Sequence, residues 1–237
     1  MVKLLKAGFF RLKKDVIFWL FVFLTIGIAG FTLFRYTSNE GVSLDKIINE
    51  FIAYIGFFIA IFVSIFVGKE HSEGIIRNKI IVGHNRISIF LSNLIISVAV
   101  SLLCEIIYLL VVFVIGIPLF GKMQMNSTEF MMVLLNTILI IISFCSIYNF
   151  ISMICSEITI STTICIIVFI AMFIAQGAFS LTAHTNEYIE NTFYDENGNK
   201  HIISQELNPN YPGDEKVKQA RLIYLSIPQG QAMEISN

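Results

Sequence analysis

The sequence is short of charged residues. Only 14% of its 237 residues are Asp, Glu, Lys or Arg, whereas a soluble domain has about 25%. Hydrophobic residues make up 56% of the chain, and the mean hydropathy is +0.77. A chain this apolar has too little polar surface to cover a globule in water. The composition therefore excludes a water-soluble globular protein and predicts an integral membrane protein.

Cysteine is scarce too, and none of it lies in a polar loop. Cys104, Cys145, Cys155 and Cys165 all fall inside apolar runs. Cysteine is among the most buried residue types, so we interpret these four as small hydrophobic side chains. They are not predicted to form disulfides or to bind metal.

Sequence patterns for catalysis and nucleotide binding are missing. The chain has no G-x-x-x-x-G-K-[ST] loop, no H-E-x-x-H and no G-x-S-x-G. His71, His84, His184 and His201 are too scattered to predict a metal site, and no basic surface suited to nucleic acid is present. We therefore expect no catalytic, cofactor or metal-binding residue on this chain, and no nucleic-acid partner.

Long apolar runs are what the sequence does contain. A helix needs about 20 mostly apolar residues to cross a bilayer. The first run exceeds the core of a cleaved signal peptide, which is about 7–15 residues long, and no cleavage site follows it. The predicted fold is all-α, with a transmembrane domain over residues 16–179. Its five predicted spans are residues 16–34, 51–67, 87–115, 130–151 and 158–179.

Lysine and arginine in the short loops predict the orientation, because cytoplasmic loops of membrane proteins are enriched in both. The loops on the opposite side hold only Arg35, Lys46 and Lys122. We therefore expect a cytoplasmic N-terminus and, after five spans, an extracellular segment over residues 180–237. The cations on the cytoplasmic side are Lys3, Lys6, Arg11, Lys13 and Lys14 before the first span, and Lys69, Arg77, Lys79 and Arg86 between the second and third spans.

Residues 1–15 have the pattern of an amphipathic helix. At 100° per residue, Val2, Leu5, Phe9 and Leu12 share one face. This pattern is typical of a helix in the inner membrane interface with its cations on anionic lipid. The alternative is a plain positive anchor with no further role. The predicted lipid-contacting cations are Lys3, Lys6, Arg11, Lys13 and Lys14.

The loop between the second and third spans, GKEHSEGIIRNKIIVGHNR, also has a helical pattern, predicted over residues 69–83. Glu73 and Arg77 have the spacing of an ion pair along a helix. Gly83 is suited to the end of that helix, and Asn85 to the start of the third span. Such a charged helix between two spans could dock on a soluble partner. A solvated connector is the alternative.

A family resemblance favours docking. The segment FVGKEHSEGIIRNKIIVGHNRISIFLSN resembles permeases of lantibiotic-immunity and bacitracin-type ABC exporters. The similar features are Glu70, then Gly74, the Arg77-Asn78-Lys79 cluster and the Gly83-His84-Asn85-Arg86 approach to the next span. Late in the chain, Asn208-Pro209-Asn210-Tyr211 and Ile227-Pro228-Gln229-Gly230-Gln231 are similar too.

The resemblance implies a transmembrane permease subunit in a bacterial plasma membrane, which exports antimicrobial or amphipathic peptides. ATP and Mg would be bound by a separate ABC ATPase subunit, and a second permease copy or paralogue would complete the pore. Six spans are usual, so we expect that the sequence is truncated before the last. The residues expected to contact the ATPase subunit are Glu70, His71, Glu73, Gly74, Arg77, Asn78 and Lys79.

Polar residues inside spans are costly and often face a transport path. Glu105, Asn136 and Gln176 are candidates for such a path. After the last span, the turn-forming residues 195–200 between Phe193-Tyr194 and His201-Ile202-Ile203 predict a β-hairpin. A short helix is predicted over residues 216–225, so the predicted extracellular segment is small and of mixed α/β structure.

Two other classes of function remain open on the sequence alone. A membrane-embedded sensor or substrate-binding subunit would have no ATPase partner of its own. A membrane enzyme would need paired carboxylates or a histidine cluster at matching depth in different spans, and the sequence does not offer them.

Overall fold

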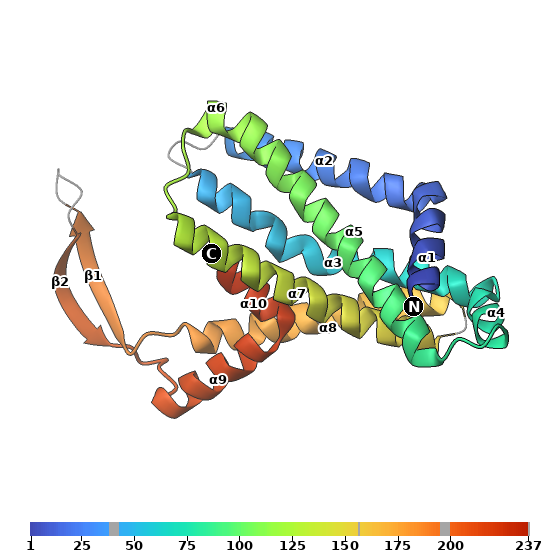
Figure 1. The fold of residues 1–237 in the computed structure, drawn as a ribbon. Coiled ribbons are helices and arrows are strands. Elements are labelled where there is room, and N and C mark those ends of the chain that lie inside the picture. Colours follow the sequence, from blue (N-terminus) through green and yellow to red (C-terminus); the bar gives the residue numbers. More distant parts are fainter. Residues whose placement is uncertain (38–42, 156, 195–199, 237) are drawn as a thin grey trace. The chain divides into compact units, whose positions relative to one another are not determined.

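A computed structural model of the chain describes residues 1–37, 43–155, 157–194 and 200–236. Most of these residues are helical, and the only strands described are a single antiparallel pair (Figure 1). In chain order the elements are α1 (Val2–Lys14), α2 (Val16–Thr37), α3 (Leu44–Ser72), α4 (Ile75–Ile81), α5 (Arg86–Val111), a π-helical turn η1 (Val112–Gly116), α6 (Ile117–Phe120), α7 (Ser127–Ile154), α8 (Ile158–Ala183), β1 (Tyr188–Tyr194), β2 (Lys200–Leu207), α9 (Asp214–Ser226) and α10 (Pro228–Ser236).

Five helices are long and apolar enough to cross a membrane, which confirms the predicted number of spans. They are α2, α3, α5 with its continuation through α6, α7 and α8. The chain is therefore a multi-pass membrane protein of all-α type with a small two-stranded addition.

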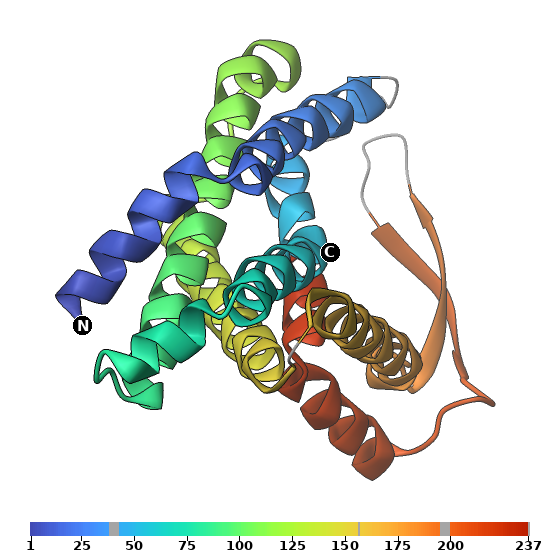
Figure 2. The ribbon, with the colours of Figure 1, turned by 90° about the vertical axis from the view of Figure 1, so that its right-hand side faces the viewer.

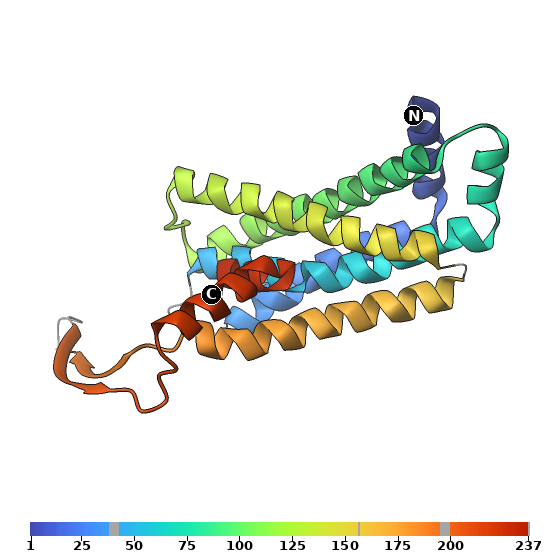
Figure 3. The ribbon, with the colours of Figure 1, turned by 90° about the horizontal axis from the view of Figure 1, so that it is seen from below.

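The chain forms two compact units, Met1–Ala171 with Ala232–Asn237, and Met172–Gln231. In the first unit, α2, α3, α5 and α7 lie side by side (Figure 1). Seen nearly end on, α3 lies between the others (Figure 2), in agreement with its long buried face. Two views place α1 and α4 at the same end of this bundle and α6 at the other (Figures 1 and 3).

The helices extend beyond the predicted spans, most of all at the start of α3. This helix begins at Leu44, seven positions before the predicted boundary at Phe51. Leu44, Ile47, Ile48 and Phe51 are all buried, and their spacing of three and four residues is that of one helix face. The polar residues between them lower the mean hydropathy of this segment. A search for long apolar runs therefore misses these first two turns of α3.

The end of the third span contains a π-helical turn, η1, and Pro118 follows two positions after it, as the second residue of α6. Proline lacks a backbone donor, and its ring clashes with the carbonyl four residues earlier in an α-helix. A wider π turn avoids this clash. The helix therefore continues to Phe120, five residues past the predicted end of the span at Ile115.

Close packing between α3 and α7 centres on Gly56. A Cβ atom there would lie 2.7 Å from Cζ of Phe144, whose ring is fully buried and stacks on Tyr148 at 5.8 Å between centroids. We expect Gly56→Ala to destabilise the protein by about 1–3 kcal/mol through overpacking. Thermal unfolding in mild detergent checks this. Gly27→Ala is the matched control, because a Cβ atom at Gly27 would meet no atom within 4 Å. Equal midpoints for both variants would contradict the prediction.

The second unit contains the predicted hairpin and the predicted short helix. β1 and β2 pair antiparallel from Tyr188↔Leu207 to Tyr194↔Lys200, with an irregularity between Asn191 and Thr192. The turn residues 195–199 lie outside the described residues. Asn208 then begins a turn, in which its Oδ1 accepts from the backbone N–H of Asn210 at 3.0 Å. α9 follows, starting two residues before the predicted Lys216.

Candidate functional site: a buried carboxylate that joins four helices

Glu70 is the central residue of the candidate site. It lies in the last turn of α3, where the sequence changes from apolar to charged. Its side chain is fully buried, with 0% exposure. An ionised carboxylate in such a position is stable only when it is paired and hydrogen-bonded.

Three donors from three other helices meet this carboxylate. Arg11 of α1 and Lys79 of α4 donate to Oε1 at 2.5 and 2.6 Å. Asn93 of α5 donates through Nδ2 to Oε2 at 2.7 Å. We call these four residues the Glu70 cluster. Charge-assisted hydrogen bonds of this length are among the strongest in proteins, so the cluster fastens α1, α3, α4 and α5 together.

Contacts beside the Glu70 cluster also join α1 to α3. The guanidinium of Arg11 lies 4.8 Å from the ring centroid of Phe66, one turn before Glu70. The neighbouring Lys69 pairs with Asp15 at 3.3 Å. The Oδ1 atom of Asp15 also accepts from the backbone N–H of Ile17 at 3.0 Å, at the first turn of α2. A second ionic contact therefore links α3 to the junction of α1 and α2.

α4 is a short helix set between two left-handed glycines, Gly74 with φ of 70° and Gly83 with φ of 94°. Its end is a Schellman motif, in which the backbone N–H groups of Gly83 and His84 donate to the carbonyls of Ile80 and Lys79. The side chain of Asn85 then accepts from the backbone N–H of Ser88 at 2.8 Å. The predicted roles of Gly83 and Asn85 at these helix ends are confirmed.

One face of α4 is turned toward the bundle and the other is exposed. Ile76 is buried and packs in one cluster with Leu4 of α1 and Ile89 of α5, while Lys79 reaches Glu70. On the opposite face the exposed side chains are Arg77, Asn78 and Ile81, with Ile81 72% exposed. Next to this face lies an open groove of about 540 Å³, lined among others by His71, Arg77, Ile80, Ile81 and Arg86.

Some of the residues predicted to contact a partner are buried, and others are exposed. Glu70 is fully buried, and the Lys79 side chain is only 14% exposed, so neither side chain is available at the surface. The predicted single helix over 69–83 is wrong, because α3 ends at Ser72 and α4 begins at Ile75. Glu73 therefore lies in the turn before α4 while Arg77 lies on α4, and no ion pair joins them in the described structure. The predicted contact residues that remain at the surface are His71, Glu73, Gly74, Arg77 and Asn78.

α1 is helical as predicted, and of the predicted apolar face (Val2, Leu5, Phe9 and Leu12) only Leu12 is buried. Leu4, Gly8 and Leu12 are buried, and Gly8 lies so close to α5 that a Cβ atom there would meet Ile96 at 2.2 Å. Arg11, predicted to contact lipid, points to Glu70 instead. Val2, Phe9 and Phe10 stay exposed. The predicted lipid-contacting cations that remain exposed are Lys3, Lys6, Lys13 and Lys14.

The three residues proposed for a transport path have different environments. Glu105 of α5 is 5% exposed, while Asn136 of α7 is exposed. Gln176 lies in the part of α8 that belongs to the second unit. Among the described residues no hydrogen bond joins Glu105 to Asn136. The structure therefore does not bring them together as one path.

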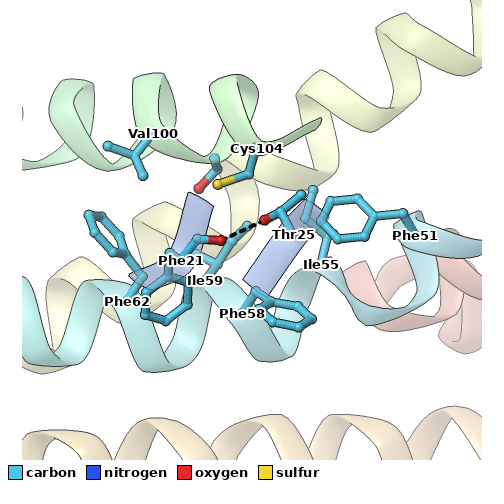
Figure 4. A pocket seen from close by; sticks show the side chains of 10 residues that line it. Phe21, Thr25, Phe51, Ile55, Phe58, Ile59, Phe62, Val100 and Cys104 are labelled. Atoms are coloured by element: carbon cyan, nitrogen blue, oxygen red, sulfur yellow. Dashed lines mark hydrogen bonds between the residues drawn. The ribbon is translucent and has the colours of Figure 1, made fainter. Parts of the chain in front are cut away.

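A small cavity lies between α2, α3 and α5 (Figure 4). Phe21, Phe51, Phe58 and Phe62 form much of its wall, with Thr25 and Cys104 at one side. The Thr25 hydroxyl donates to the Phe21 carbonyl at 2.8 Å. The volume is about 20 Å³, which is the size needed for a single water molecule. The cavity is too small and too apolar to be a substrate site.

Within the described ranges, no three His, Cys, Asp or Glu side chains are grouped so that they could hold a metal ion. No family model, curated protein or solved structure matches the chain. The residues and contacts of the chain itself therefore carry the functional inference.

Proposed function

We propose that the chain is the transmembrane permease subunit of an ATP-driven ABC exporter of the lantibiotic-immunity or bacitracin type. In this proposal α4 and the end of α3 before it dock on a separate ATP-hydrolysing subunit, through His71, Glu73, Arg77, Asn78 and Ile81. The observation that carries the proposal is the fixed attachment of α4, through Lys79 and Glu70, to the helices of the bundle.

The two faces of α4 suit a coupling element. Lys79 and Ile76 hold the inner face, and the outer face presents one cation, one amide and a largely exposed isoleucine. Isolated exposed apolar residues are common on protein surfaces, but Ile80, Ile81, Val82 and Ile87 are exposed close together in sequence beside the groove. An apolar centre with a charged rim is the usual composition of a protein interface.

A displacement of α4 can be transmitted to the other helices through the Glu70 cluster. Lys79 of α4 donates to the same carboxylate that accepts from Arg11 of α1 and Asn93 of α5, so a movement of α4 that displaces Glu70 also acts on α1 and α5. In the proposed cycle, ATP binding by the partner moves α4, and α3 and α5 follow. The peptide substrate, the second permease copy, the bacterial plasma membrane and the cytoplasmic location of α1 and α4 belong to this proposal.

A pull-down from native membranes in mild detergent, followed by mass spectrometry, tests the proposal. We expect a P-loop ATPase in near-stoichiometric amount with the unmodified chain. The double variant Arg77→Glu and Ile81→Glu should reduce its recovery at least about tenfold, because a loss of only 1.4 kcal/mol of binding free energy has that effect. Lys79 is not used for this purpose, since its replacement would also break the Glu70 cluster.

Lys122→Glu is the matched control. This charge reversal lies in the exposed segment between α6 and α7, away from α4, and should leave the recovery of the ATPase unchanged. If no ATPase is recovered with the unmodified chain in several detergents, or if the α4 variant retains it fully, the proposal is wrong. The first of these results would favour a sensor or binding subunit.

A further inference from the structure

α5 carries a line of buried polar side chains along one face. Asn93, Ser97, Ser101 and Glu105 are spaced by four residues, which places them on the same side of the helix. Their exposures are 0, 0, 6 and 5%. At 1.5 Å per residue the line extends roughly 18 Å along the helix, from the Glu70 cluster at Asn93 to Glu105. Polar side chains in a span are costly, so a line of them indicates a function.

Glu105 is the carboxyl group of this line, and its side chain, like the Ser97 hydroxyl, has no hydrogen-bond partner among the described residues. In the described part of the chain no hydrogen bond or ion pair reaches it, and its Oε2 atom is inaccessible and unpaired. Glu70, at the other end of the line, has three donors. Glu105 on this face and Glu70 of α3 at its end are therefore held in opposite ways.

The helices packed against this part of α5 provide no cation for Glu105. Arg35 of α2 pairs with Glu50 and Lys69 of α3 with Asp15, while Lys46 of α3 is exposed, and α7 contains no Lys, Arg or His. The titratable groups close to Glu105 are Cys104 and Tyr108 of its own helix, of which Tyr108 donates to the Ile47 carbonyl at 2.7 Å. Cys145 of α7 contacts Ser101, one turn away.

An unpaired carboxylate ion in such surroundings costs several kcal/mol, whereas the neutral acid does not. We propose that Glu105 is a proton-binding site within the membrane span. In the arrangement described here its carboxyl group holds the proton. When the helices rearrange and water reaches the group, the O–H bond breaks, the proton passes to water and the carboxylate remains.

The polar face of α5 provides a route for this proton. Ser97 Oγ and Asn93 Oδ1 are buried and have no protein partner, so each can hydrogen-bond to water. Successive members of the line are about 6 Å apart along the helix axis. This is too far for a direct hydrogen bond but within the reach of one bridging water. The route ends beside the Glu70 cluster, to which Asn93 donates.

Infrared spectroscopy of the full chain in lipid vesicles tests the proposal without any transport assay, so its outcome does not depend on the proposed ABC function. We expect a carbonyl band of a buried carboxylic acid at neutral pH, shifted in deuterium oxide and lost in Glu105→Gln. Glu129→Gln is the matched control, because Glu129 is exposed and its capping interaction with Asn126 can also be made by glutamine. This variant should keep the band.

A second measurement needs no variant. Dicyclohexylcarbodiimide partitions into membranes and reacts with protonated carboxyl groups, so peptide mass spectrometry should find Glu105 labelled and Glu70 and Glu129 unlabelled.

The route is tested by the rate of deuteration. In Ser97→Ala, deuterium should replace the acid proton of Glu105 several-fold more slowly, while the infrared band itself remains. An unchanged band in Glu105→Gln, or equal labelling of Glu105 and Glu129, would overturn the proposal. Unchanged deuteration in Ser97→Ala would overturn the route.

Discussion

Replacing Glu70 by glutamine is expected to lower the unfolding midpoint in mild detergent by roughly 5–10 °C. The substitution keeps the shape of the side chain but removes the anion that Arg11 and Lys79 share, and the side chains of these two cations are 29 and 14% exposed. Removing one partner from a buried ionic contact typically costs about 3 kcal/mol or more. The partial exposure of both cations allows some relaxation toward water, so we expect a value near the lower limit.

Glu73→Gln is the matched control for this prediction. Glu73 is exposed three positions further along the chain, and its replacement should leave the midpoint nearly unchanged. The double variant Glu70→Gln and Lys79→Met removes a cation together with the anion. It should therefore be less destabilised than the sum of the single variants by about 1–2 kcal/mol. Additive effects, or an equal loss for Glu73→Gln, would show that the Glu70 cluster does not bind the four helices together.

Gly230→Ala is expected to open the corner between α9 and α10. A Cβ atom at this position would lie 2.0 Å from the backbone carbonyl oxygen of Tyr224, and a backbone atom cannot move aside as a flexible side chain can. Tyr224 is held by packing with Ala183 and Ala220 and by an edge contact with His184 at 5.4 Å. Overpacking of this kind costs about 1–3 kcal/mol.

Limited trypsin digestion reports this opening, because α9 contains Lys218 and Arg221. The cleavage rate is proportional to the fraction of molecules in which the corner is open. Cleavage should therefore be faster by roughly tenfold to a hundredfold in Gly230→Ala. Gly177→Ala, in α8 of the same unit, would place its Cβ atom more than 4 Å from any neighbouring atom and should digest like the unmodified chain. Identical digestion of both variants would mean that the corner can accept a side chain.

The sequence predicted the number of spans, the hairpin and the helix ends at Gly83 and Asn85, because each depends on local chemistry. An apolar run, a cluster of turn residues or a capping side chain needs no knowledge of distant contacts. The helix boundaries were less accurate. At α3 the apolar residues before Phe51 alternate with Asp45, Lys46 and Glu50, and averaged hydropathy conceals a buried face within such a segment.

The Glu70 cluster could not be predicted in the same way. Its members are separated by 59, 9 and 23 positions, and nothing in one sequence states which polar residues meet. We expected Glu70 and Lys79 at the surface because the family resemblance implies that they contact the ATPase subunit. Asn93 was the available signal, since an amide within an apolar span requires a polar partner, and Glu70 ends the preceding span.

The face of α1 that packs on the protein was not predicted, for a different reason. In water the apolar face of a helix points to the protein, but at a membrane the lipid offers a second apolar environment. Val2 and Phe9 therefore remain exposed while Leu4 and Leu12 pack inward. Gly8 between them was the informative residue, because small residues permit close helix approach in membrane proteins.

The distances along the chain within the Glu70 cluster also determine an order of assembly during synthesis. When Glu70 leaves the ribosome, Arg11 has already been made 59 positions earlier, but Asn93 follows 23 positions later. Ile96, against which Gly8 packs, comes later still. The packing surface of the newborn α1 is therefore incomplete until the third span has been made, although its partners in α3 and α4 are already present. One face of α1 is thus completed in two steps, first by contacts with α3 and α4 and then by close packing on α5.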